Sequence, residues 1–139
     1  MPANINPIFT RLGDIQWNTT PILALNATTD LTTGISYVVF TADATNGGYV
    51  QKLRFRPLGT NVATVARVWI NNGLTNGTAA NNVLFDEISI ASSASNNAAA
   101  LSNYELPLNF ALPPGYRLYV TLGTAAAAGF DISVIGGKY

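Results

Sequence analysis

The residue types that most often carry catalysis, histidine and cysteine, do not occur in this chain of 139 residues. Without the commonest general base and without a thiol, a Ser or Thr nucleophile would need Lys52, Lys138 or a carboxylate beside it. Neither Gly-x-Ser-x-Gly nor Ser-x-x-Lys occurs in the sequence. We therefore do not expect an acyl-transfer enzyme.

The carboxylates do not show the pattern of a glycosidase, which needs two acids flanking a cleft at a set separation. Only Asp86 and Glu87 are neighbours, and adjacent side chains of a strand point to opposite faces. The remaining acids are interpreted as solvated groups at strand ends and turns: Asp14, Asp30, Asp43, Glu105 and Asp131. The sequence contains no Asp-x-Asp-x-Asp run of the kind that indicates a calcium site. Asp and Asn side chains and backbone carbonyl groups in loops could still bind a calcium ion. The sequence predicts a non-enzyme with no cofactor and no metal.

The cations are more clustered than the acids. Lys52, Arg54 and Arg56 alternate along one segment, so they share one face of a strand whose other face carries Leu53 and Phe55. Arginine and tryptophan are the residues that anchor protein interfaces. We therefore interpret this face as a candidate protein-binding surface.

A hairpin through residues 60–61 would extend this surface, because it places Arg54 across from Arg67 and Lys52 across from Trp69. In a jelly roll, successive strands instead cross between two sheets, which would divide the patch. Other interpretations are solvation, binding of single-stranded nucleic acid, or pairing with acids on neighbouring strands, namely Asp14, Asp86 or Glu87.

Charge is sparse and balanced, with seven Lys or Arg against seven Asp or Glu. A chain without net charge lacks the field that steers proteins onto nucleic acid or acidic membranes, so neither partner is expected. No apolar run is long enough to predict a transmembrane helix, and the N-terminal residues do not resemble a signal peptide. Asn-x-Thr triplets at Asn18, Asn26 and Asn76 are interpreted as products of the composition.

Apolar residues recur at every second position in short runs between Gly, Asn and Pro, which is typical of β-strands. Residues 35–42 are apolar on both faces and predict a central strand. Residues 92–102 predict either one helical turn or an exposed loop. Further strands are expected at residues 15–17, 21–27, 49–58, 62–71, 83–91, 105–112, 116–122 and 130–135. The strand at 83–91 needs a bulge, and Pro107 places the strand at 105–112 at an edge or a bulge. The last strand is expected to end at Gly136. The predicted fold is all-β, a jelly-roll-like β-sandwich of about eight strands in one domain over residues 12–139.

Residues 1–11 are apolar but poorly suited to a long helix. We expect an extended N-terminal arm that lies on a neighbouring subunit, and the alternative is a frayed terminus. Its candidate interface residues are Ile5, Pro7, Ile8, Phe9 and Arg11.

Two stretches resemble small structural proteins of tailed bacteriophages. They are GISYVVFTADATNGGYVQKLRFRPLGTNVATVARVWINNG, residues 34–73, and the C-terminal LPLNFALPPGYRLYVTLGTAAAAGFDISVIGGKY. The most telling pieces are GTNVATVARVWINNG, LPPGYRLYVTLGT and the terminal GGKY. The family is that of head decoration proteins, also called cement or auxiliary capsid proteins, and the resemblance covers residues 34–139.

The resemblance implies a jelly-roll or related sandwich that trimerises and locks major capsid subunits together from outside. The expected function is thus a virion structural protein on the capsid surface, made in the host cytoplasm, whose partners are the major capsid protein and further copies of itself. An alternative is a phage tail or fibre module that binds a receptor or carbohydrate. A hydrolase would need two carboxylates converging in a cleft.

Overall fold

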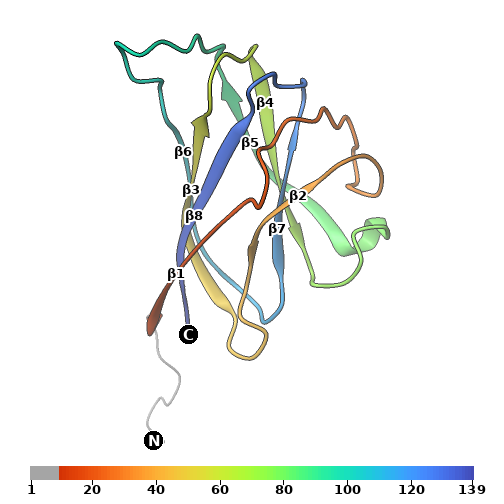
Figure 1. Ribbon diagram of the computed structural model, residues 1–139. Coiled ribbons are helices and arrows are strands. Elements are labelled where there is room, and N and C mark those ends of the chain that lie inside the picture. Colours follow the sequence, from red (N-terminus) through yellow and green to blue (C-terminus); the bar gives the residue numbers. More distant parts are fainter. Residues whose placement is uncertain (1–9) are drawn as a thin grey trace, which may run out of the picture.

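A computed structural model describes residues 10–139, which form eight β-strands and one short 3-10 helix (Figure 1). The elements are β1 (Leu12–Trp17), β2 (Tyr37–Thr41), β3 (Gly48–Pro57), β4 (Thr64–Asn71), η1 (Ala79–Asn81), β5 (Asn82–Ile90), β6 (Tyr104–Leu112), β7 (Arg117–Leu122) and β8 (Phe130–Lys138).

The strands form two antiparallel sheets with the orders β1-β8-β3-β6 and β2-β7-β4-β5. The first strand pairs with the last, the second with the second last, and so on to β4 with β5. A long antiparallel hairpin wrapped into two layers has this pairing, and it defines a jelly roll. The predicted β-sandwich is confirmed.

The hydrophobic core lies between the two sheets, as strand alternation predicts. On β8, Phe130, Ile132 and Val134 are buried, whereas the intervening Asp131 is exposed. Each buried side chain of this size contributes about 1.5–3 kcal/mol relative to leaving it in water. The side chains that β3 and β4 turn inward are fully buried: Leu53, Phe55, Ala66 and Val68.

The expected central strand at residues 35–42 is wrong in its position. β2 is an edge strand of its sheet. It is not covered on both faces, because Val38 remains 41% exposed while Val39 and Phe40, at a register shift, are buried. The expected strand at residues 21–27 is also wrong. Ile22 bridges to Phe130 on one sheet and Leu25 bridges to Leu122 on the other. A segment that passes from one sheet to the other cannot continue as a strand in either.

β8 does not end at Gly136, because it runs on through Gly137 to Lys138. A side chain at Gly136 would collide with the Tyr49 carbonyl oxygen of β3. The glycine therefore permits a close approach of two backbones rather than ending the strand.

The expected irregularities are confirmed. Pro107 lies on edge strand β6, beside a register shift in the pairing of β3 and β6. The shift in β5 leaves Phe85 without a partner between Leu84 and Asp86. Residues 94–100 are an exposed loop without helix, which was one of the two alternatives.

Candidate protein-interaction surface

The predicted interface is divided between the two sheets. Lys52, Arg54 and Arg56 lie on β3 in one sheet, whereas Arg67 and Trp69 lie on β4 in the other. The predicted hairpin is wrong, because β3 pairs with β6 and β8 while β4 pairs with β5 and β7. This is the division that a jelly roll imposes on successive strands.

Trp69 is not a surface residue, so its assignment to the interface is wrong. It is 1% exposed and packs with Leu31 and Tyr119 in a second, smaller core. Its indole nitrogen donates a hydrogen bond to the Thr121 hydroxyl at 3.0 Å. The loop that carries Leu31 supplies the cover, and strand alternation alone contains no signal for it.

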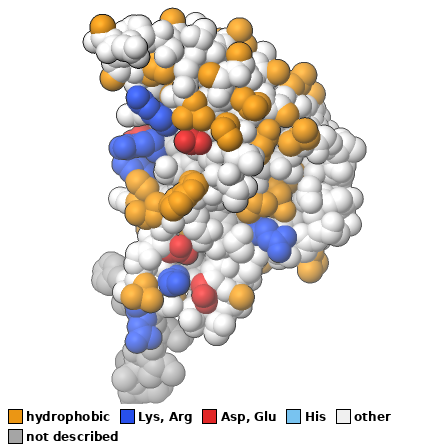
Figure 2. Space-filling view, viewed as in Figure 1, with side chains coloured by type: hydrophobic (Ala, Val, Ile, Leu, Met, Phe, Trp, Pro, Cys, Tyr) orange, Lys and Arg blue, Asp and Glu red, His pale blue; other side chains and the backbone are white. Residues whose placement is uncertain are grey.

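Pairing across the first sheet arranges the remaining residues in rows on its solvent side, because directly paired residues share a face. One row runs through Ile15, Ile135, Lys52 and Pro107. The next row runs through Trp17, Ser133, Arg54 and Glu105. A third contains Asp131 and Arg56. We call these ten residues the outer face. Figure 2 shows Lys and Arg side chains gathered along one margin of the molecule beside hydrophobic ones.

β1 turns its apolar side outward. Ile15 and Trp17 are 59% and 64% exposed, whereas the alternate residues Asp14 and Gln16 are partly buried. An edge strand normally buries its apolar side against the core and presents its polar side to water. An apolar side left on the surface makes β1 a candidate site of interaction.

Glu105 holds two of the cations on the outer face. It accepts hydrogen bonds from Arg54 at 2.8 Å and from Lys52 at 3.0 Å. These bonds, the one from Arg54 first, hold the pKa of the Glu105 carboxyl below its ordinary 4.5. Arg56 donates to the Leu101 carbonyl at 2.6 Å. The outer face thus has three cations against the carboxylates of Glu105 and Asp131, and its guanidinium groups are held in position.

Sequence reasoning expected acid partners for the cations but did not identify Glu105. Its strand, β6, is brought beside β3 only by the jelly-roll order, in which the third strand pairs with the sixth. Of the three acids that were considered as partners, Glu87 pairs with Arg67 at 2.8 Å. Among the arm residues, Arg11 is exposed and its backbone N–H donates to the Lys138 carbonyl at 3.0 Å. The other predicted arm residues lie outside the described residues: Ile5, Pro7, Ile8 and Phe9.

A second apolar edge, which sequence reasoning missed, lies on β5. Val83, Leu84 and Phe85 are consecutive and all exposed. The rings of Phe85 and Phe110 are 5.0 Å apart between centroids and tilted by 52°, so this contact joins β5 of one sheet to β6 of the other. Three successive apolar residues at a broken register were the available signal.

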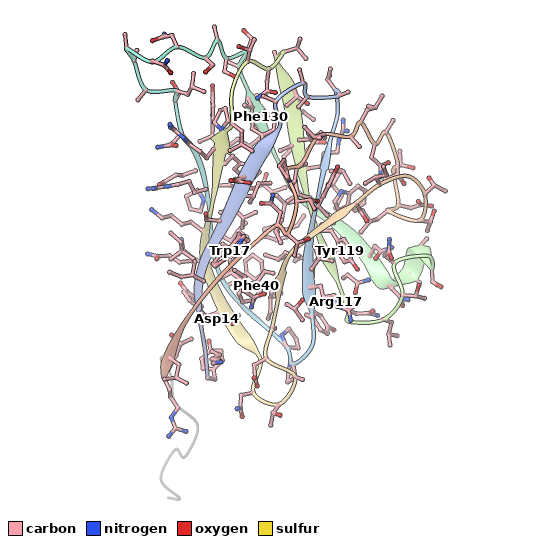
Figure 3. All side chains as sticks on the ribbon, viewed as in Figure 1. Asp14, Trp17, Phe40, Arg117, Tyr119 and Phe130 are labelled. Atoms are coloured by element: carbon pink, nitrogen blue, oxygen red, sulfur yellow. The ribbon has the colours of Figure 1, made fainter. Side chains whose placement is uncertain are left out.

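A groove of about 500 Å³ lies between β1 and β2, the neighbouring edges of the two sheets. Figure 3 labels Trp17 and Phe40, which line it from β1 and β2 respectively. The groove is lined by Gln16, Trp17, Asn18, Thr19, Thr20, Ser36, Tyr37, Val38, Val39 and Phe40.

Within residues 10–139, no three Asp or Glu side chains come together as a metal site. The described part of the chain also contains no helix of the length and apolarity that crossing a membrane requires. Comparisons with protein-family models, with curated proteins and with solved structures find no match for this chain.

Proposed function

We propose that this chain is a virion structural protein that decorates or cements the outside of a phage capsid through protein–protein contacts. The observation that carries the proposal is the outer face, where exposed Ile15 and Trp17 lie on the same sheet surface as Lys52 and Arg54. Apolar anchors beside ordered arginine are the composition of an interface centre rather than of an ordinary solvated sheet.

The fold and the available chemistry support the same function. Jelly rolls occur in viral capsid and lectin domains, an analogy of fold that leaves the function to be argued from surfaces. The sequence has neither His nor Cys, so a reaction would rely on carboxylates, lysines and hydroxyl groups alone. A capsid-bound protein needs contact area and repeated copies instead of an active site.

The proposed partners are the major capsid protein and further copies of this chain, as a trimer on the capsid surface after synthesis in the host cytoplasm. Three cations against two carboxylates on the outer face favour a capsid surface with carboxylates around an apolar centre. The second apolar edge at Val83–Phe85 is the candidate contact between copies. A formal net charge of zero leaves little repulsion between those copies. Nucleic acid and membranes are not proposed as partners.

The test is co-sedimentation of the protein with heads of the encoding phage that lack it. The double variant Lys52→Ala/Arg54→Ala should bind heads at least about tenfold more weakly, equivalent to about 1.4 kcal/mol. Arg67→Ala is the matched control, because Arg67 also pairs with a carboxylate but lies on the other sheet. A protein that remains free of particles at every stage of phage assembly contradicts the proposal.

A further inference from the structure

We propose that the groove between β1 and β2 binds a neutral oligosaccharide, an activity beyond the proposed capsid contacts. The volume of about 500 Å³ is within the range of about 300–1,000 Å³ that small-ligand sites occupy. In the described chain none of the ten lining side chains carries a charge. A phosphate, a carboxylate sugar or a charged peptide would therefore find no counter-charge there, whereas the hydroxyl groups of a neutral sugar match this lining.

The lining supplies the two kinds of contact that a sugar ring uses. Thr19, Thr20 and Ser36 bring hydroxyl groups, each both a donor and an acceptor. Trp17, a residue that is 64% exposed, brings a large flat aromatic ring. The C–H groups on one side of a sugar ring stack on such a surface, while the equatorial hydroxyl groups reach the polar side chains around it.

The groove is held in shape before any ligand arrives. The Asn18 side chain donates to the Thr20 carbonyl at 2.7 Å and accepts from the Ile132 N–H at 2.7 Å, so the 18–20 wall is anchored to β8. On the other wall, the Tyr37 hydroxyl accepts from the N–H of Ala24 at 3.2 Å. A preformed site loses little conformational entropy on binding.

An added peptide strand is the other occupant that a groove between edge strands suggests, and two features disfavour it. The Gln16 side chain occupies both backbone groups of Thr41. The pairing register of β2 also shifts between Val38 and Phe40. A bulged and partly capped edge does not offer the continuous ladder that strand addition requires.

The experiment follows backbone amide NMR shifts of the full chain during titration with maltotriose, cellotriose, mannotriose and chitotriose. Trigalacturonic acid and an uncharged peptide of alternating Thr and Val serve as comparisons. We expect at least one neutral trisaccharide to shift residues 16–20 and 36–40. Trp17→Ala should weaken that binding at least about tenfold.

The matched control is Phe85→Ala, which removes an aromatic side chain that is 48% exposed from the opposite edge of the sandwich. It should leave sugar binding unchanged, and thermal melting should show that both variants are folded. The proposal is overturned if no neutral sugar shifts the groove at about 10 mM, a concentration that fills a millimolar site. It is equally overturned if the peptide or the acidic sugar binds there more tightly, or if Trp17→Ala binds as well as the wild type. Trp17 also belongs to the outer face, whereas Lys52 and Arg54 do not line the groove. The double variant Lys52→Ala/Arg54→Ala therefore tests head binding separately from sugar binding.

Discussion

The side-chain amide of Gln16 pairs with the backbone of Thr41 as a neighbouring strand would. Its nitrogen donates to the Thr41 carbonyl at 2.9 Å, and its oxygen accepts from the Thr41 N–H at 2.8 Å. Gln16 lies on β1 and Thr41 on β2, so one side chain links the adjacent edges of two different sheets. It also satisfies edge groups that would otherwise be open to another chain.

Gln16→Ala should therefore lower the free energy of unfolding by about 1 kcal/mol, since water replaces the two lost hydrogen bonds with Thr41 and the one with Asp14 at this exposed edge. Urea denaturation monitored by fluorescence measures the change. Gln51→Ala is the control, because Gln51 is exposed at the register shift of β3, and it should change stability by less than about 0.5 kcal/mol. Equal losses in the two variants would show that the link to Thr41 contributes nothing.

Two glycines that lie near each other in the first sheet should respond oppositely to a methyl group. Gly136→Ala drives a Cβ into the Tyr49 carbonyl oxygen, so β3 and β8 must separate at a cost of about 1–3 kcal/mol. Gly13→Ala on β1 meets no atom within 4 Å. It should be neutral or stabilise by about 0.4–1 kcal/mol through the unfolded state. Thermal unfolding of both variants compares them, and a neutral Gly136→Ala would contradict the close approach.

Acid should destabilise the protein through carboxylates that are hydrogen-bonded in the fold. The hydroxyl and N–H of Thr32 lower the pKa of Asp30 from its ordinary 3.8, and the N–H of Asn46 does most to lower the pKa of Asp43 from the same value. The pKa of Glu105 is also lowered. Because the unfolded chain takes up protons first, these contributions are complete above the ordinary values and are lost as the pH falls through the folded ones.

The melting temperature should accordingly stay level from neutral pH down to about pH 5, because the chain has no histidine that would titrate in this range. Below about pH 5 the melting temperature should fall. In the double variant Asp30→Asn/Asp43→Asn, the amide oxygens can still accept the turn hydrogen bonds but cannot titrate. Its acid-induced loss should be shallower than that of the wild type. An identical pH profile would mean that these two turns do not contribute to the pH dependence.

The strands were predictable from the sequence where their geometry is local. Phe130, Ile132 and Val134 alternate with outward residues on β8, and this two-residue period follows from the strand backbone itself. The turn at Pro113–Gly115 was predictable for the same reason, because Gly115 has the positive φ of 77° that favours glycine. Eight short strands with such turns have few ways to form a closed core, so the sandwich followed.

The candidate surface was less predictable, because it depends on which strands become neighbours. Arg54 and Glu105 are 51 positions apart in the sequence, and only the order of the first sheet brings them within 2.8 Å. The outward direction of Ile15 likewise depends on β1 pairing with the last strand of the chain. The periodicity of a strand predicts that it has two faces but does not predict which face remains exposed.

Trp69 shows how a covered residue can be distinguished by experiment from one in an interface. Its indole N–H donates to the hydroxyl of Thr121, and both side chains are buried. Trp69→Phe removes the donor and leaves the Thr121 hydroxyl without this partner, which should lower the free energy of unfolding by about 1–3 kcal/mol. Head binding by the folded fraction should not change, because Leu31 and Tyr119 rather than a partner protein cover this site.

A double-mutant cycle separates the lost hydrogen bond from the change in packing. Thr121→Val alone leaves the indole N–H unpaired, whereas Trp69→Phe/Thr121→Val removes both polar groups from the buried site. Replacing both hydrogen-bonding groups by apolar ones costs less than leaving one buried polar group without a partner. The double variant should therefore lose about 1 kcal/mol less unfolding free energy than the two single variants lose together. Strict additivity of the two losses in urea denaturation would show that the 3.0 Å contact does not stabilise the fold. If Trp69→Phe instead lost head binding without losing stability, Trp69 would be a residue of the interface after all.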